Sequence, residues 1–211
     1  RIKSLGIPFD PQFNEPLDKN GLFQKLKLNP DIPTVLIMGG GQGLGPIKTI
    51  VKSLEKVKRE IQEIVVCGAN KKLYKSLKRR IKKYKKKILL FGYAHNINEL
   101  MRMSDVIITK PGGVTTAEVL ANHLPMVIVK PLPGQEANNT SYLVEKGAAI
   151  KVDKPRQVNL AVENLLANPV KLKEMSEATR RISKPNASLD IARLLLVLNP
   201  RAGLVEEPVL I

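Results

Sequence analysis

Residues 105–139, DVIITKPGGVTTAEVLANHLPMVIVKPLPGQEANN, decide the fold of this chain. A short apolar run at 106–108 leads into the turn Pro111-Gly112-Gly113, after which a helical pattern begins. A second apolar run and a second polar loop follow. Strand, glycine turn, helix and strand in this order predict a parallel βαβ unit. Because the first N–H groups of a helix attract anions, the unit also predicts a phosphate site.

The same alternation runs through most of the chain. Strands are each followed by a helix, which requires right-handed crossovers and parallel pairing. The sequence therefore predicts an α/β fold, a Rossmann-like and mostly parallel sheet with helices on both faces. The expected strands are 34–38, 63–67, 88–91, 106–109, 126–129 and 149–152. The expected helices are 46–59, 71–84, 97–103, 114–123, 136–146, 157–167, 170–182 and 187–198.

The two ends of the chain differ from this pattern. Prolines at positions 8, 11, 16 and 30 and little periodicity predict that residues 1–30 form a linker or lead-in, with one short helix at 17–27. Residues 31–199 are expected to form the α/β domain, and 200–211 an extended tail. The start, RIKSLGIP, has neither an initiator methionine nor the apolar core of a signal peptide, so we expect a segment of a longer chain.

Composition narrows the class of protein. Of the 211 residues, 43% are hydrophobic, which is ample material for a core. The longest apolar runs fall far short of the roughly 20 residues that cross a bilayer. The single cysteine, Cys67, excludes an intrachain disulfide and fits a buried thiol in a reducing compartment.

The chain is strongly basic, and much of the excess charge is local. The 35 Lys and Arg against 19 Asp and Glu give a formal net charge of +16. Eleven basic residues and no acid lie in 71–87, where apolar residues recur at helical spacing. The segment indicates a solvated helix surface, a patch for anionic lipid or a nucleic-acid site; the scarcity of aromatic stacking partners disfavours nucleic acid. The candidate lipid patch comprises Lys78, Arg79, Lys82, Lys83 and Lys86.

Polar or glycine-rich loops follow the predicted strands, so they should meet at the carboxyl edge of the sheet. The loop 39–45, GGGQGLG, lacks the Gly-Lys-Ser/Thr ending of a P-loop, and no acid follows the second strand as in a dinucleotide site. It is either a tight turn or a place where a ligand approaches the backbone. Glu118, one turn into its helix, suits ribose hydroxyls or is a surface residue. The amides and acid of 131–139 suit a polyhydroxylated ring or cap the next helix.

Several motifs together closely resemble the C-terminal donor domain of glycosyltransferase family 28. They are GGGQG at 39–43, FGY at 91–93, ITKPGGVT at 108–115, Glu118, and PGQE at 133–136 with Asn139. Within the family they are most similar to the processive diacylglycerol glucosyltransferases and the plant monogalactosyldiacylglycerol synthases. The resemblance covers about residues 1–185 and implies the C-terminal half of a GT-B glycosyltransferase.

The resemblance also implies residue roles. The uracil would lie at Gly92 and Tyr93, the ribose at Glu118 and the diphosphate at the start of the following helix. The residues implied for UDP are Gly41, Gln42, Gly43, Gly92, Tyr93, Gly112, Gly113, Val114, Thr115, Thr116 and Glu118. Those implied for the hexose are Gln135, Glu136, Asn138 and Asn139. No cofactor and no obligatory metal is expected, and the UDP-sugar is a substrate. No catalytic residue is expected in this chain, because the family's proposed base and acceptor groove belong to an N-terminal domain.

The resulting hypothesis is the donor half of a peripheral enzyme on the cytoplasmic face of a membrane. The intact protein would be an inverting transferase that moves a hexose from a UDP-sugar to diacylglycerol or a glycosyl-diacylglycerol, while this chain alone would be inactive. The motif TKPGG favours glucose over galactose. The alternatives are a peptidoglycan N-acetylglucosaminyltransferase, a UDP-sugar epimerase and a non-catalytic basic binding module. An epimerase needs an acid and histidine constellation, for which only His95 and Glu136 are at hand.

Overall fold

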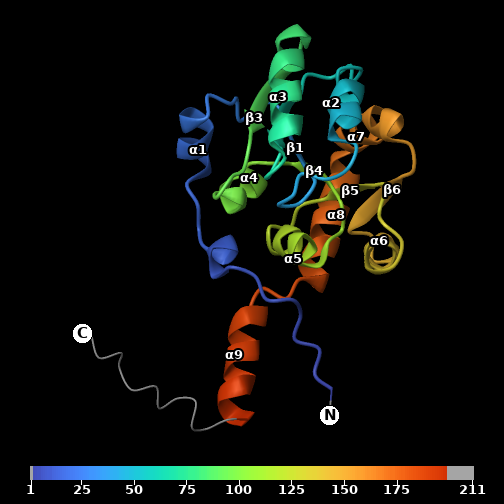
Figure 1. Cartoon of the computed structure of the whole chain (residues 1–211). Helices are drawn as coiled ribbons and strands as arrows, with labels where there is room; N and C mark the ends of the chain where they lie inside the picture. Colours follow the sequence, from blue (N-terminus) through green and yellow to red (C-terminus); the bar gives the residue numbers. More distant parts are fainter. Residues whose placement is uncertain (1, 199–211) are drawn as a thin grey trace, which may run out of the picture.

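The computed structural model describes residues 2–198 and contains a six-stranded parallel sheet with the strand order β3-β2-β1-β4-β5-β6 (Figure 1). This confirms the predicted α/β fold. All six strands were predicted, and their ends are shifted by at most one residue, at β2 and β3. The strands are β1 (Thr34–Met38), β2 (Gln62–Val66), β3 (Lys87–Phe91), β4 (Val106–Thr109), β5 (Met126–Val129) and β6 (Ala149–Val152).

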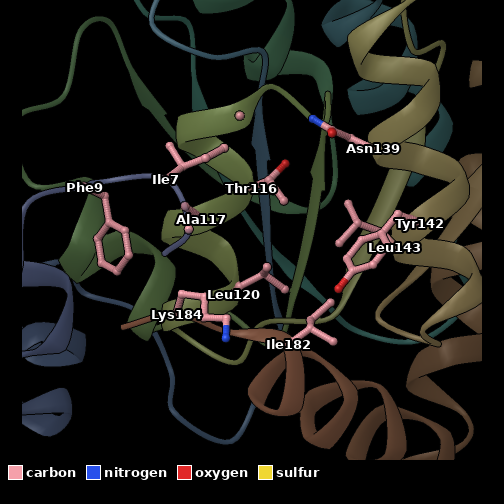
Figure 2. A pocket seen from close by; sticks show the side chains of 12 residues that line it. Ile7, Phe9, Thr116, Ala117, Leu120, Asn139, Tyr142, Leu143, Ile182 and Lys184 are labelled. Carbon is pink, nitrogen blue, oxygen red and sulfur yellow. The ribbon is translucent and has the colours of Figure 1, made fainter. Parts of the chain in front are cut away.

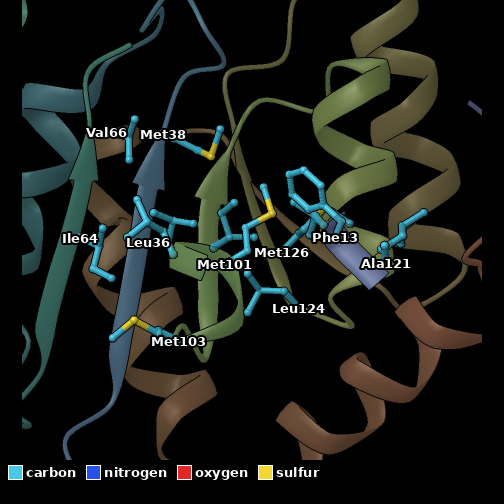
Figure 3. Packing of buried hydrophobic residues seen from close by; sticks show 14 of the residues in the cluster. Phe13, Leu36, Met38, Ile64, Val66, Met101, Met103, Ala121, Leu124 and Met126 are labelled. Atoms are coloured by element: carbon cyan, nitrogen blue, oxygen red, sulfur yellow. The ribbon is translucent and has the colours of Figure 1, made fainter. Parts of the chain in front are cut away.

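The central strands are buried along their whole length because both faces of the sheet are covered. Alternate residues supply two separate cores. Leu36, Ile64 and Met126 belong to one core, part of which Figure 3 shows. Ile37 and Val65 point to the other face and belong to the second core.

Helices cover both faces of the sheet. The second core includes residues of α2 (Ile47–Leu54), α3 (Lys71–Arg80) and α7 (Val158–Leu166). The first core includes residues of α4 (Ile97–Arg102) and α5 (Gly113–Ala121). The other helical elements are η1 (Pro11–Asn14), α1 (Lys19–Lys25), η2 (Ile81–Lys83), α6 (Gln135–Glu145), η3 (Pro155–Gln157), α8 (Pro169–Ile182) and α9 (Ala187–Leu198).

Two helices end four or five residues earlier than the sequence pattern predicts. The helix expected at 46–59 ends at Leu54, where the N–H of Val57 bonds the carbonyl of Leu54 at 2.9 Å. This tight turn lets Val57 and Ile61 return to the core, so their spacing mimics a longer helix. The helix expected at 71–84 likewise ends at Arg80 and continues only as the 3-10 turn η2.

The segment expected as a linker packs against the domain. Phe9, Phe13, Phe23 and other apolar side chains of 9–28 are buried in the first core. The N–H of Phe9 donates to Ser188 Oγ at 3.0 Å, and that hydroxyl donates back to the carbonyl of Phe9 at 2.6 Å. The lead-in from Phe9 onward therefore packs on the α/β domain whose start was predicted at residue 31. The apolar residues of 9–28 are irregularly spaced, so they leave no periodic pattern in the sequence.

The C-terminal helix α9 does not close the domain as expected. It extends away from the body of the domain (Figure 1), and Ala187 is its only buried residue. Leu195 and Val197 are 60% and 75% exposed. The tail predicted at 200–211 lies outside the described residues. Within residues 2–198 no helix combines the length and apolar character needed to cross a membrane.

Candidate functional site

The strand order places a switch point at the carboxyl edge of the sheet, where doubly wound sheets form a crevice. The chain leaves β1 toward α2 on one face and leaves the neighbouring β4 toward α5 on the other face. At such a switch point the loops that follow the two strands diverge, and ligands of doubly wound sheets bind there. The loops 39–45 and 110–112 therefore line the mouth of the crevice.

The glycine loop after β1 is partly a tight turn and partly open backbone. A Cβ on Gly39 would lie 1.8 Å from the carbonyl oxygen of Leu44, and one on Gly43 would lie 1.8 Å from the carbonyl oxygen of Cys67. These positions require glycine because the backbone of the loop packs on itself and on residues 67–70. A Cβ on Gly40 or Gly41 would meet nothing within 4 Å. Of the predicted UDP residues in this loop, Gly41 and Gln42 are exposed and Gly43 is buried.

The first turn of α5 is open to an anion. Gly112 precedes the helix without a side-chain cap, and the first turn carries no acid. The N–H of Thr116 is bonded to the carbonyl of Gly112 at 2.8 Å, whereas those of Gly113, Val114 and Thr115 precede the first intrahelical bond. Free N–H groups and the helix dipole together favour a phosphate at this point.

An apolar cavity of ≈ 180 Å³ lies beside this turn, between α5, α6 and the lead-in (Figure 2). Ile7, Leu120 and Leu143 are among its walls, and Thr116 and Asn139 add polar atoms (Figure 2). The hydroxyl of Thr116 is buried and has no hydrogen-bond partner within the described residues. These walls suit apolar groups better than a diphosphate.

Glu118 lies one turn further along α5 and is half-buried. Burial, and to a lesser degree the neighbouring carboxylate of Asp10, raises the pKa of the Glu118 carboxyl to about 7. Near neutral pH this side chain is thus partly protonated, and its ionised form is an acceptor for hydroxyl donors. Within residues 2–198 the carboxyl group of Glu118 has no hydrogen-bond partner.

The polar loop after β5 is joined to the Pro-Gly-Gly turn by side-chain contacts. Glu136 Oε1 lies 2.8 Å from Lys110 Nζ, and Oε2 accepts the N–H of Leu132 at 2.8 Å. Asn139 Nδ2 donates to the carbonyl of Pro111 at 2.8 Å. The amide nitrogen of Gln135 lies 3.4 Å from the place of a Cβ on Gly113.

Three of the residues predicted for the hexose therefore face the turn that opens α5, while Asn138 is exposed and makes no side-chain bond within the described range. Lys110 was not among the residues predicted from the sequence for this site. Its position as the one basic residue within the motif TKPGG could have indicated it.

The loop after β3 presents an aromatic ring and open backbone. Tyr93 is 62% exposed, and its ring lies edge-on to His95 with centroids 5.0 Å apart. A Cβ on Gly92 would meet nothing within 4 Å. A hollow of ≈ 460 Å³ between the loops after β2 and β3 is lined by Gly68, Ala69, Lys71, Tyr74, Lys75, Gly92 and Tyr93.

The second histidine has structural contacts. His123 follows α5 in the left-handed conformation with φ 54°, and its Nδ1 lies 3.1 Å from the carbonyl of Leu120. Within residues 2–198, no three His, Cys, Asp or Glu side chains gather as a possible metal site.

The basic patch lies at the other end of the sheet. Because α3 runs back from the carboxyl edge, η2 and the start of β3 lie at the amino edge. Leu73 and Leu77 are buried, and the cations of 71–87 are exposed except Lys86, which is half-buried. None of these cations forms an ion pair within the described part of the chain.

Comparisons with known proteins agree with this architecture. Residues 34–193 match the glycosyltransferase family 28 C-terminal domain. The processive diacylglycerol beta-glucosyltransferase of Bacillus licheniformis is 39% identical over 188 residues, which are 89% of this chain and 49% of that protein. The chain thus spans about half the length of the curated relatives it matches.

Two solved structures illustrate the shared fold. MurG of Acinetobacter baumannii has a TM-score of 0.67 and 20% identity over 83% of this chain and 53% of that one. Anabaena HepE in complex with UDP-glucose has a TM-score of 0.62 and 17% identity over 90% of this chain and 56% of that one. The fold is that of the C-terminal half of a GT-B glycosyltransferase, as predicted. The chain belongs to glycosyltransferase family 28, and its residues 34–193 are the family's C-terminal domain.

Proposed function

We propose that the crevice over the ends of β1 and β4 binds a UDP-hexose. The observation that carries this proposal is the uncapped first turn of α5, at the switch point and joined to a loop rich in amides and carboxylate. The diphosphate lies on the N–H groups of 113–115 and near the open backbone of Gly41 and Gln42. Among the described residues the hydroxyl of Thr116 has no hydrogen-bond partner, but it is buried in the wall of the apolar cavity beside this turn.

The remaining groups of the donor have partners around this point. The ribose bonds to Glu118, and the uracil contacts Gly92 and Tyr93, whose backbone and ring are accessible. The hexose lies against Gln135, Glu136, Asn138 and Asn139. When the bond to the sugar breaks, the N–H groups and the dipole of α5 stabilise the charge that develops on the departing UDP.

For the intact protein we propose transfer of glucose, with inversion, to diacylglycerol or a glycosyl-diacylglycerol. The name of the curated relatives and the motif TKPGG support this acceptor class and this sugar. They do not favour the N-acetylglucosaminyltransferase or the epimerase, whose likeness to this chain is one of fold. We propose that the acceptor groove and the general base lie outside the residues of this chain, which spans about half the length of the curated relatives it matches.

We further propose that the patch Lys78, Arg79, Lys82, Lys83 and Lys86 rests on an anionic membrane surface. All of these residues except the half-buried Lys86 are exposed, and none forms an ion pair within the described residues. This supports the proposal, because each basic residue near such a surface contributes about 1 kcal/mol. The protein would then work as a peripheral enzyme on the cytoplasmic face. The patch is at the amino edge, so it can act without obstructing the crevice.

Calorimetry with UDP, UDP-glucose, UDP-galactose and UDP-N-acetylglucosamine tests the donor site. We expect the chain to bind UDP and to prefer UDP-glucose among the sugars. A basic binding module would ignore all four ligands and bind nucleic acid with a steep salt dependence. Absence of binding to every uridine nucleotide would overturn the proposed function.

A further inference from the structure

Lys110 lies where the loops of β1, β4 and β5 meet. It follows β4 directly, and its Cδ lies 3.6 Å from the place of a Cβ on Gly45 in the loop after β1. Its ammonium reaches Glu136, at the start of α6, at 2.8 Å. One side chain therefore lies beside one neighbouring loop of the crevice and pairs with a residue of the other.

This ion pair differs from the others in the described structure. The side chains of Lys110 and Glu136 are 15% and 16% exposed. In the pair Lys151–Asp153, which has the same 2.8 Å separation, the side chains are 47% and 79% exposed. A shielded pair is held in one geometry and is screened little by salt, whereas an exposed pair contributes little.

The carboxylate of Glu136 is held at both oxygens. Oε1 bonds Lys110, and Oε2 accepts the backbone N–H of Leu132. A carboxylate has about four acceptor positions, so these bonds leave roughly two for other donors. With both oxygens fixed, the free positions have a defined direction.

The same turn carries the anion site. The N–H of Gly112 bonds the carbonyl of Lys110 at 3.0 Å, and Asn139 bonds the carbonyl of Pro111. The residue that orients Glu136 is thus continuous with the turn that opens α5. A hexose linked to a phosphate on α5 would meet the carboxylate at a set distance.

We propose that Lys110 is a positioning residue for hexose selection, which acts by holding Glu136 and not by binding the donor. The inference rests on the proposed function and deepens it. Glucose and galactose differ in the direction of one hydroxyl group, so discrimination between them requires an acceptor that cannot follow the hydroxyl. Without Lys110 the carboxylate keeps only the bond from the N–H of Leu132, so its other oxygen is no longer fixed and can accommodate either sugar.

The test is calorimetry on this chain with UDP, UDP-glucose and UDP-galactose, using Lys110→Met, Lys110→Arg, Glu136→Gln and the double variant Lys110→Met/Glu136→Gln. Lys110→Met should bind UDP as the parent does and lose about tenfold in UDP-glucose affinity, the order expected for one charge-assisted hydrogen bond. The affinity for UDP-galactose should change less, so the preference for UDP-glucose over UDP-galactose should become smaller. Lys110→Arg should restore the preference, and the double variant should be no weaker than Glu136→Gln.

Lys151→Met is the matched control, because it breaks an equally short but exposed ion pair. It should leave all affinities unchanged. Circular dichroism melts would identify a variant that fails to fold, in which case Glu136→Gln, which keeps the shape of the side chain, carries the test of sugar preference.

The outcomes separate the inference from the function on which it rests. Equal losses for UDP and UDP-glucose in Lys110→Met would show that Lys110 binds the diphosphate, and would overturn the inference alone. An unchanged preference in Lys110→Met would overturn it too, as would additive losses in the double variant. A parent chain that binds no uridine nucleotide would overturn the proposed function and the inference together.

Discussion

The two ends of the sheet use charge in opposite ways. At the carboxyl edge, Lys110 and Glu136 are shielded, paired and hydrogen-bonded, and they join separate loops. At the amino edge, the cations of 78–87 are mostly exposed and form no ion pair in the described structure, while the buried carboxylate of Glu63 has no hydrogen-bond partner there. Paired, shielded charge fixes geometry, whereas unpaired charge responds to salt, pH and partners.

The largest expected effect concerns the close packing of the carboxyl edge. Gly39→Ala places a Cβ 1.8 Å from a backbone oxygen, so the loop must move, and the free energy of unfolding should fall by about 3 kcal/mol or more. The control Gly41→Ala, where a Cβ meets nothing within 4 Å, should change stability by less than about 1 kcal/mol. Urea unfolding of both variants measures this, and equal losses would mean that the loop is not packed as described.

The next effect concerns the ribose contact. Glu118→Ala should weaken the binding of UDP by about 1.5–3 kcal/mol, because a charged hydrogen-bond acceptor is lost. The raised pKa adds a pH dependence: UDP-glucose affinity of the parent should increase as pH rises through about 7, where the carboxyl ionises. Glu118→Gln should abolish that increase. Calorimetry at pH values on both sides of about 7 is the measurement. A parent affinity for UDP-glucose that is independent of pH would contradict the role of Glu118.

At the amino edge, removal of two cations should weaken membrane binding and nothing else. Lys82→Gln with Lys83→Gln should cost about 2 kcal/mol in binding to vesicles of phosphatidylcholine and phosphatidylglycerol, at about 1 kcal/mol per residue. UDP-glucose affinity should stay at the parent value. Co-sedimentation measures vesicle binding, and Lys171→Gln with Lys173→Gln removes the same charge from α8 as a control. Equal effects of the two pairs would show that net charge, not the patch, determines binding.

The smallest expected effect concerns Glu63. Burial, with a contribution from Glu55, raises the pKa of Glu63 well above its ordinary value. The folded state thus holds a proton that the unfolded state releases, so stability falls as pH rises above the ordinary pKa of a glutamate. Glu63→Met should remove this loss and raise the free energy of unfolding at neutral pH. Thermal unfolding at several pH values is the measurement; a variant with the parent's pH profile would contradict it.

The repeating part of the fold was predictable, and the irregular parts were not. The strands of the sheet were found because runs such as TVLIM and MVIV are fully buried and leave a clear apolar signal. The end of α2 was missed because Val57 and Ile61 keep near-helical spacing after the helix stops at Leu54. The packing of 9–28 was missed because Phe9 and Phe13 pack edge to face within an irregular segment. Such a segment leaves no helix or strand pattern in the sequence.

The candidate site was predictable in its location and not in its contacts. Pro111-Gly112-Gly113 and Gln135-Glu136 were predicted to meet, because the loops after parallel strands share one edge. Which groups remain open to a ligand could not be predicted. Gly43 packs on Cys67, and the bond from Asn139 to Pro111 occupies one of its donors.

By itself the sequence determined the order of strands and helices, the edge where the loops gather and the glycine turn before α5, since each depends on local pattern and on the handedness of βαβ crossovers. Only the tertiary structure decided that Lys110 pairs with Glu136, that apolar residues of 9–28 join the core and that Glu63 is buried without a hydrogen-bond partner among the described residues. These facts depend on distances between residues far apart in the chain. The free energy of a buried charge depends on the groups around it, and these groups come together only when the chain folds.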